Sequence, residues 1–288
     1  MRWLVTGAAG MLGQDLVEVL GGEGLDVRAV DREEVDITDP RAVATAVADR
    51  DVVVNCAAWT AVDAAEEREG DAFTVNAVGP ATLARALAGT GGRLVQISTD
   101  YVFDGNAEHP YAPDAPQRPR SAYGRTKAAG EWAVAASGVD HLVVRTAWLY
   151  GARGPCFPRT VQRVLTERGG IDVVDDQVGQ PTWTRDLAAY VVRLVEAGAP
   201  TGSYHGTSQG QTSWFGFAGA VAASMGLAAD VVRPTTSEAF VRPAPRPAYS
   251  VLAHDQRAGV APIGDWADRW RAAADEVLGL DAAVRPGA

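Results

Sequence analysis

The chain has 288 residues, of which 47% are hydrophobic and 22% charged, a composition typical of a globular protein with room for one large α/β domain and a smaller lobe. Its net charge of -10, without any Lys/Arg block, argues against a nucleic acid polymer as partner. No apolar run approaches the roughly 18 residues of a membrane span, and two cysteines without metal-ligand spacing favour a reducing cytoplasm.

Short β-branched runs alternate along the chain with longer amphipathic runs rich in Ala and Leu. Strands are predicted at 2–7, 26–30, 51–56, 93–98, 141–150 and 171–176. Helices are predicted near 11–20, 40–49, 70–89, 121–137, 157–168 and 184–198. Strands that are apolar throughout are typical of a parallel sheet covered on both faces by crossover helices. The alternation therefore predicts an α/β fold of the Rossmann type, with a doubly wound parallel sheet.

The pattern loosens after about residue 170. A short strand followed by a helix capped at Thr212 or Ser213 is expected, then a Pro-rich stretch over 233–256 and a terminal amphipathic helix over 264–279. We predict a sheet domain at 1–170 and a smaller C-terminal lobe at 171–288, with some segments of the lobe returning to the main sheet.

A glycine triplet follows the first predicted strand and opens the first helix. Gly7, Gly10 and Gly13 have GxxGxxG spacing, which lets the backbone turn tightly and approach a pyrophosphate at the helix N-terminus. Such a triplet is also found in purely structural turns, but its place between an N-terminal strand and a helix favours dinucleotide binding.

Asp31 ends the second strand, where a carboxylate can hold the ribose hydroxyls of NAD. Arg32 beside it can instead pair with the 2′-phosphate of NADP, so the choice between NADH and NADPH stays open, and a merely solvated loop is the alternative. Asp36 and Ile37 are expected near the adenine. Asn76, on a later helix, is expected to reach a backbone group beside the dinucleotide.

Thr99, Tyr123 and Lys127 form the predicted catalytic set. Thr99 ends the fourth strand beside the crevice, and Tyr123 and Lys127 share one face of a helix at i and i+4. We expect Lys127 to lower the pKa of Tyr123, which would then donate a proton to a carbonyl oxygen, while Thr99 hydrogen-bonds the same oxygen. A YxxxK pair alone is weak evidence for a catalytic site, and the glycine triplet and the Thr99 hydroxyl strengthen it.

The sequence resembles the dTDP-4-dehydrorhamnose reductase family of the extended short-chain dehydrogenase/reductase superfamily over nearly its whole length. The resemblance is carried by "STDYVFDG", "YGRTK", "RTAWLYG", "DDQVGQPTWTRDLA", "YHGTSQGQTSW" and "RPAYSVL". It implies that residues 1–170 are an NAD(P)-binding domain with the catalytic Thr/Tyr/Lys set, and that residues 171–288 mainly bind substrate.

The resemblance also implies individual roles. It places Thr99 and Asp100 on the sugar ring, and Trp148 in the wall of the substrate pocket. The residues implied at the cofactor are Gly10, Met11 and Leu12 on the pyrophosphate, Asp36, Ile37, Ala58, Trp59 and Thr60 near the dinucleotide, and Lys127 on the nicotinamide ribose. Arg246 is our own candidate for the substrate's diphosphate; a surface arginine is the alternative.

Two features depart from the family pattern. Trp59 stands where members often carry histidine, which affects only the pocket edge. Some members use Mg²⁺ at a dimer interface, and although Asp15 is a possible counterpart, one acid does not define a site and no metal ligands are predicted.

The expected function is NAD(P)H-dependent reduction of the C4 keto group of dTDP-4-dehydro-L-rhamnose to dTDP-L-rhamnose. One alternative is a 4-ketoreductase for another dTDP-deoxysugar or for dihydrostreptose in a natural-product pathway. The other is a non-catalytic, cofactor-binding subunit resembling the regulatory subunit of methionine adenosyltransferase. A homodimer is expected from the family, and neither nucleic acid nor membrane is expected as a partner.

Overall fold

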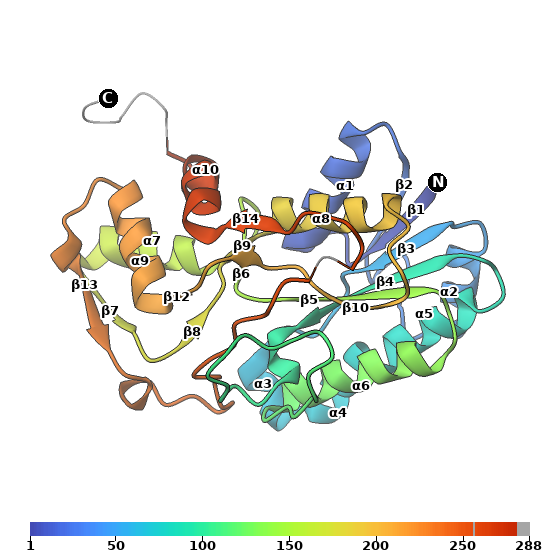
Figure 1. Cartoon of the computed structure of the whole chain (residues 1–288), viewed down its shortest axis with the longest axis horizontal. Coiled ribbons are helices and arrows are strands. Elements are labelled where there is room, and N and C mark those ends of the chain that lie inside the picture. The colour runs from blue at the N-terminus through green and yellow to red at the C-terminus, as the bar shows by residue number, and fades with distance from the viewer. Residues whose placement is uncertain (256, 281–288) are drawn as a thin grey trace.

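A central sheet of six parallel strands organises the computed structural model, which describes residues 1–255 and 257–280 (Figure 1). The strand order is β2-β1-β3-β4-β5-β10. The strands are β1 (Arg2–Thr6), β2 (Asp26–Val30), β3 (Val52–Asn55), β4 (Arg93–Thr99), β5 (His141–Thr146) and β10 (Gly202–His205). The order reverses between β1 and β3, and ligands bind outside the carboxyl ends of the strands at such a switch point.

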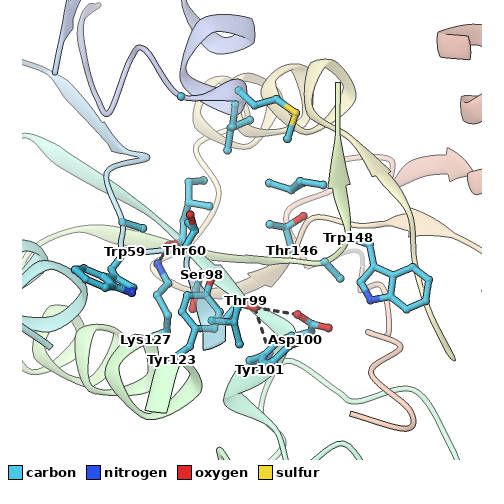
Figure 2. Close-up of a pocket in the computed structure, with 18 of the residues that line it drawn as sticks. Trp59, Thr60, Ser98, Thr99, Asp100, Tyr101, Tyr123, Lys127, Thr146 and Trp148 are labelled. Carbon is cyan, nitrogen blue, oxygen red and sulfur yellow. Dashed lines mark hydrogen bonds between the residues drawn. The ribbon is translucent and has the colours of Figure 1, made fainter. Parts of the chain in front are cut away.

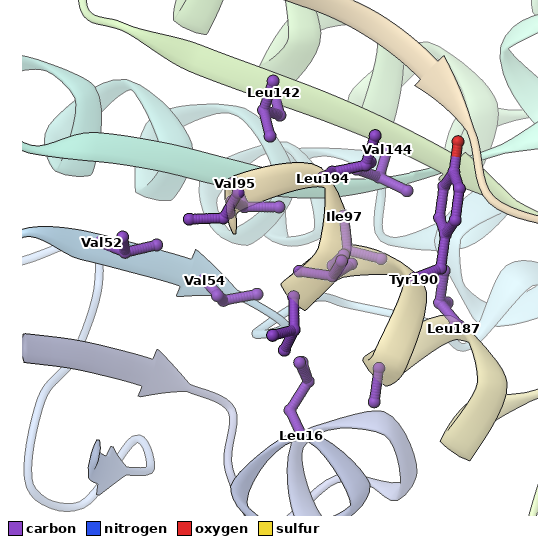
Figure 3. Close-up of a cluster of buried hydrophobic side chains, with 14 of the residues drawn as sticks. Leu16, Val52, Val54, Val95, Ile97, Leu142, Val144, Leu187, Tyr190 and Leu194 are labelled. Atoms are coloured by element: carbon purple, nitrogen blue, oxygen red, sulfur yellow. The ribbon is translucent and has the colours of Figure 1, made fainter. Parts of the chain in front are cut away.

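Helices cover both faces of the sheet because alternate strand residues point to opposite sides. Leu16 of α1 (Met11–Gly22) and Leu187 of α8 (Thr184–Glu196) pack with Val54 on one face (Figure 3). Leu4 and Leu83 share the core of the other face. That second face is covered by α2 (Pro40–Val47), α5 (Gly79–Leu87) and α6 (Ala122–Ala136). The predicted Rossmann-type doubly wound sheet is confirmed.

The helix predicted over 70–89 is one continuous helical run with an irregular centre. It consists of α4 (Glu69–Phe73), a π-helical turn (Thr74–Val78) and α5, and it follows the short helix α3 (Val62–Glu67). A π-turn holds one residue more than an α-helical turn, and such turns are frequent at functional sites.

A second lobe packs around its own apolar core, which includes the buried side chains Phe217 and Trp270. Its helices are α7 (Phe157–Arg168), α9 (Trp214–Ser224), whose N-cap is Ser213 as predicted, and α10 (Trp266–Leu278). Its short strand pairs are β7 (Ile171–Val174) with β13 (Val232–Thr235), β6 (Leu149–Tyr150) with β9 (Thr182–Trp183), β8 (Val178–Gly179) with β12 (Thr212–Ser213), and β11 (Ser208–Gln209) with β14 (Ile263–Asp265).

Two strand predictions are wrong in part. The strand predicted at 171–176 exists as β7, but it pairs with β13 in the lobe, and the sixth strand of the main sheet is β10. The strand predicted at 141–150 stops at Thr146 and resumes only at Leu149, because Trp148 adopts a left-handed backbone conformation with φ of 48° that interrupts the extended chain.

Segments from beyond residue 170 return to the main sheet, namely β10 and α8, whereas α7 lies before that residue and packs in the lobe core. The division at residue 170 therefore remains a prediction as a domain boundary. Within the described residues, no helix combines the length and apolar character needed to cross a membrane.

Candidate active site

A cavity of about 1210 Å³ lies at the carboxyl edge of the sheet, between the sheet and the lobe (Figure 2). Every site residue predicted from the sequence lines it: Gly7, Gly10, Met11, Leu12, Gly13, Asp31, Arg32, Asp36, Ile37, Ala58, Trp59, Thr60, Thr99, Asp100, Tyr123, Lys127, Trp148 and Arg246. Residues that are far apart in sequence meet here because parallel strands end at one edge.

The glycine loop between β1 and α1 forms a cradle that side chains would fill. Gly7 has φ of 66°, and a Cβ atom there would lie 2.6 Å from the backbone nitrogen of Ala57. A Cβ atom on Gly13 would lie 2.3 Å from the carbonyl oxygen of Gly7. α1 begins at Met11 without a side-chain cap, so its N-terminal N–H groups remain available to an anion. The loop therefore fits a pyrophosphate.

Asp31 braces this loop. Its carboxylate accepts the backbone N–H of Ala9 at 2.8 Å and that of Arg32 at 2.8 Å. The Arg32 side chain is 83% exposed and approaches Asp36 only at 3.9 Å. The exposed Arg32 guanidinium can pair with a 2′-phosphate, and the Asp31 carboxylate keeps acceptor capacity for ribose hydroxyls besides its two backbone donors, so this part of the cavity fits NADPH and NADH.

Asp36 and Ile37 line the adjoining part of the cavity. Asp36 accepts hydrogen bonds from the backbone and hydroxyl of Thr38, which lower the pKa of its carboxyl group. Ile37 is buried and offers an apolar surface. Together they fit the predicted place of an adenosine.

Asn76 fixes the loop after β3. Its side-chain oxygen accepts the N–H of Trp59 at 2.8 Å, and its amide donates to the Trp59 carbonyl and to the Thr126 hydroxyl, both at 3.1 Å. Asn76 lies in the π-helical turn, which aims its side chain at this loop. The prediction that Asn76 reaches a backbone group is confirmed.

Thr99 ends β4 and begins a 3-10 turn (Asp100–Val102). Its hydroxyl donates to the Asp100 carboxylate at 2.9 Å and accepts the N–H of Tyr101 at 3.2 Å (Figure 2). Burial raises the pKa of Asp100 to about 6, although hydrogen bonds from Ser250 and Thr99 oppose the shift. The hydroxyl and carboxyl groups thus form a pair in which the hydroxyl proton can turn toward a bound carbonyl oxygen.

Tyr123 and Lys127 lie on α6, whose N-cap Ser121 accepts the N–H of Gly124. Figure 2 shows Tyr123 beside Thr99 and Lys127 extending from the same helix toward the sheet. Lys127 is 4% exposed and donates to the carbonyl oxygen of Ile97 at 2.7 Å. The pair therefore faces the cavity from one helix, as the i, i+4 spacing predicts.

The expected direction of the Tyr123 pKa shift is wrong for this structure. Burial raises the pKa of Tyr123, and its hydrogen bond with the Thr99 hydroxyl opposes the increase without overcoming it. Burial also lowers the pKa of Lys127 to about 8, against the opposing effect of Glu131. Tyr123 is accordingly a neutral phenol at pH 7, the form that donates a proton.

Trp148 and Trp214 form an aromatic wall on the lobe side of the cavity. Their rings stack with centroids 3.6 Å apart, and Gly179 lies against Trp148 so closely that a Cβ atom there would come within 2.5 Å of the ring. Trp214 also packs against Phe157. Sequence reasoning identified Trp148 but missed Trp214, although Trp214 ends one of the stretches that carry the family resemblance.

Arg246 lines the cavity but is bound by the protein. Its guanidinium donates to Asp63 at 2.9 Å and to the carbonyl oxygen of Ala244 at 3.1 Å. Arg242, which the sequence analysis missed, also lines the cavity and is exposed. Arg242 therefore adds an exposed guanidinium that suits a diphosphate, whereas the charge of Arg246 is already paired with Asp63.

Asp15 lies away from the cavity lining. It is buried, accepts a hydrogen bond from the Thr184 hydroxyl at 2.5 Å and so joins α1 to α8, while burial raises its pKa. Within residues 1–255 and 257–280, no group of three or more His, Cys, Asp or Glu side chains is placed to hold a metal ion.

Comparison with known proteins shows which family has this sequence and fold. The family model described as "RmlD substrate binding domain" matches residues 1–280. A Streptomyces griseus protein named dTDP-4-dehydrorhamnose reductase is 49% identical over 92% of this chain and 90% of its own length. A Streptomyces antibioticus protein named probable dTDP-4,6-dihydroxy-2-methyloxan-3-one 4-ketoreductase is 48% identical over 98% of this chain and 97% of its own.

A solved structure gives the same fold. The dTDP-4-dehydrorhamnose reductase of Bacillus anthracis in complex with NADP superposes with a TM-score of 0.90 at 36% identity, over 94% of this chain and 98% of that one. On this match and those of the relatives, the chain belongs to the dTDP-4-dehydrorhamnose reductase family, the family of the RmlD substrate binding domain.

Proposed function

We propose that this protein reduces the C4 keto group of dTDP-4-dehydro-L-rhamnose to dTDP-L-rhamnose, with NADPH or NADH as reductant. The observation that carries the proposal is one cavity in which the glycine cradle at Gly7 and Gly13 opens beside Thr99, Tyr123 and Lys127. The Streptomyces griseus relative and the Bacillus anthracis structure described above are both named dTDP-4-dehydrorhamnose reductase, which supports the same reaction.

The reduced nicotinamide supplies a hydride to carbon C4 of the sugar. Tyr123 donates its phenolic proton to oxygen O4, so that the ketone gains one hydride and one proton and becomes an alcohol. The raised pKa of Tyr123 keeps that proton in place until the oxygen becomes basic. Thr99 donates a second hydrogen bond to the same oxygen as its negative charge develops, and Asp100 accepts from a neighbouring sugar hydroxyl.

The remaining predicted residues hold the two ligands. The glycine loop and the N-terminal turn of α1, with Met11 and Leu12, receive the pyrophosphate. Ala58, Trp59 and Thr60 follow β3 beside it. Lys127 would hold the nicotinamide ribose, because its ammonium has two further protons to donate besides the one on Ile97.

On the substrate side, Trp148 and Trp214 would flank the sugar, and Arg242 with Arg246 would face the diphosphate. A homodimer, a cytoplasmic location, and the lack of nucleic acid and membrane partners remain predictions.

A second candidate is the 4-keto reduction of a different dTDP-deoxysugar. It is favoured by the Streptomyces antibioticus relative, which is named for such a reaction and matches this chain over 98% of its length. Both candidates use the same catalytic set and differ only in the pocket around the sugar.

The test is to follow oxidation of NADPH and NADH by the purified protein with dTDP-4-dehydro-L-rhamnose made in situ, and with a panel of other dTDP-4-keto sugars. We expect the highest kcat/KM with the rhamnose precursor. Tyr123→Phe should lower kcat by about 10²–10⁴-fold. The matched control is Tyr204→Phe on β10, because the Tyr204 hydroxyl donates to the carbonyl oxygen of Pro200 and Tyr204 does not line the cavity, so this variant should leave kcat unchanged. Another preferred sugar would support the second candidate, and near-normal turnover by Tyr123→Phe would refute both.

A further inference from the structure

A row of three buried polar side chains crosses the apolar sheet. Thr6, Asn55 and Gln96 occupy matching positions on the neighbouring strands β1, β3 and β4, where Thr6 pairs with Asn55 and Asn55 with Gln96. Each is at most 2% exposed. Two residues earlier on the same strands and the same face stand the apolar residues Leu4, Val53 and Leu94, which are the usual occupants of such positions.

The three side chains form a directed chain of hydrogen bonds. The Thr6 hydroxyl donates to the side-chain oxygen of Asn55 at 2.7 Å, and the Asn55 amide donates to the side-chain oxygen of Gln96 at 2.8 Å. The Gln96 amide then donates to the carbonyl oxygen of Ile97 at 2.8 Å. Each donor points the same way, so the bonds polarise one another toward Ile97.

The chain ends on the atom that holds the catalytic lysine. The Ile97 carbonyl oxygen accepts from Gln96 and also from Lys127 Nζ, at 2.7 Å. A carbonyl oxygen has two lone pairs. Because Gln96 occupies one of them, the other is left to Lys127, and the direction of its ammonium is thereby fixed.

We propose that Gln96, with Asn55 and Thr6 behind it, is a positioning residue for Lys127 in the reduction proposed above, on which this inference rests. The chain, called the amide ladder here (Thr6, Asn55 and Gln96), holds the Ile97 carbonyl so that the remaining two protons of the ammonium point to the cofactor ribose and Tyr123. An apolar row would pack equally well but would leave both lone pairs of the Ile97 carbonyl oxygen open, so that the Lys127 ammonium could approach it from more than one direction.

The ladder also places its positive ends toward the ammonium. The other ionisable groups around Lys127 are Glu131 and Tyr123 on α6 and the Cys56 thiol after β3, and Glu131 is paired with Arg145 of β5. None of these is altered when the ladder is removed. Loss of the ladder should therefore raise the pKa of Lys127, because the Gln96 N–H group lies on the same carbonyl oxygen as the ammonium and its positive end disfavours the lysine charge.

The decisive variant is the triple substitution Thr6→Val, Asn55→Leu and Gln96→Met. Replacing both partners of the two side-chain bonds by apolar groups of similar shape is nearly neutral for folding, and the Ile97 carbonyl oxygen keeps Lys127 as a donor. We expect a melting temperature close to that of the wild type, kcat lower by up to about 10²-fold, the scale of a catalytic group misplaced by about 1 Å, and little change in the KM of the sugar nucleotide. The alkaline limb of kcat, expected near pH 8 from Lys127, should move to higher pH.

Leu94→Ala is the matched control, since it opens the same face of the same strand and leaves the ladder intact. It should lower the melting temperature while preserving kcat and its alkaline limb. A triple variant with the wild-type kcat and pH profile would show that the ladder only supports the sheet, and would overturn the proposal.

A substrate-free measurement separates this result from failure of the proposed reaction. The rate of acetylation of Lys127 by trace acetic anhydride, followed by mass spectrometry from pH 6 to pH 11 (about the range that brackets a lysine pKa), reports the pKa of the amine in each protein. An increase in the triple variant supports the ladder's role even if the sugar substrate proves to be a different one. An unchanged profile overturns that role whether or not the reduction is observed.

Discussion

Trp148 stacks on Trp214 with an angle of 7° between the ring planes. The first residue follows β5 of the main sheet and the second begins α9 of the lobe. The stack therefore joins the two halves of the molecule across the cavity, and each ring restricts the position of the other.

Trp214→Ala should raise the KM of the sugar nucleotide by about 2–10-fold, because aromatic pairs contribute about 0.5–1.5 kcal/mol beyond burial. The kcat value should change little, since Trp214 lies away from Tyr123 and Lys127 on the lobe. Steady-state kinetics measure both. Trp132→Ala is the matched control, because Trp132 is 59% exposed on α6 and does not line the cavity. Equal KM values for the two variants would exclude a role of the stack in substrate binding.

The buried carboxyl group of Asp100 should produce an acid limb in kcat/KM near pH 6. Its pKa is raised from 3.8 to about 6, so it stays protonated up to that pH and accepts hydrogen bonds fully only above it. Activity should therefore rise as pH increases through 6, and Asp100→Asn should remove this limb. A limb unchanged in Asp100→Asn would assign it to another group.

The same shift has a consequence for stability. The folded protein binds more protons than the unfolded chain between the two pKa values, so the contribution of Asp100 to stability is lost as pH rises from about 4 to about 6. The melting temperature of Asp100→Asn should lack this part of the pH dependence. Thermal melts of both proteins at several pH values test it.

Arg32→Ala should raise the KM of NADPH by about tenfold, the scale of one charge-assisted hydrogen bond of about 1.5 kcal/mol to the 2′-phosphate. The KM of NADH should stay the same because NADH lacks that phosphate. Arg28→Ala is the control, since Arg28 is exposed on β2 and does not line the cavity. Equal changes for both cofactors would mean that Arg32 only supports the loop.

The buried ion pair between Glu131 and Arg145 should make single substitutions costly. Each side chain is 4% exposed, and Glu131 also accepts hydrogen bonds from Ser98 and Gln117. Glu131→Leu leaves Arg145 buried and unpaired, which should lower the free energy of unfolding by about 3–5 kcal/mol. Urea denaturation measures the loss.

The double variant Glu131→Leu with Arg145→Met provides the internal control. It removes both charges and should recover most of that stability. If the double variant is no more stable than the single one, the loss arises from packing and not from the unpaired charge.

Much of the cofactor half of the site could be predicted from the sequence, because local patterns encode it. A glycine triplet after a strand, an acid ending the next strand and a hydroxyl ending the fourth lie at one edge of any parallel sheet. Thr99, Tyr123 and Lys127 follow from those rules together with helical spacing. The family resemblance added Trp148 and Asp100, which such rules alone do not reveal.

The lobe was harder to predict because its contacts join remote segments. β10 is only four residues long, and several strands of the lobe have only two residues. Such strands are too short to show a periodic pattern of apolar residues in the sequence. Trp214 and Arg242 enter the cavity through such segments. The direction of the Tyr123 pKa shift depends on burial by residues from several elements, which spacing on one helix cannot convey.

The amide ladder, in contrast, left a signal in the sequence. Thr6, Asn55 and Gln96 each interrupt or end a strand that is otherwise apolar, and aligning the strand ends would have placed them in one row. Polar residues at matching positions of adjacent buried strands indicate a shared network, because none could be buried alone without loss.

At the π-helical turn Thr74–Val78, the orientation of Asn76 depends more on the number of residues in the helix than on which side chains they carry. Deleting a single residue would let the run continue as a regular α-helix, and each α-helical residue turns the helix by about 100°. α5 could keep its packing on the sheet, but Asn76 would rotate away from Trp59. A surface loop can gain or lose residues at little cost, whereas a one-residue change in this helix would move the support of the loop after β3 in a single step.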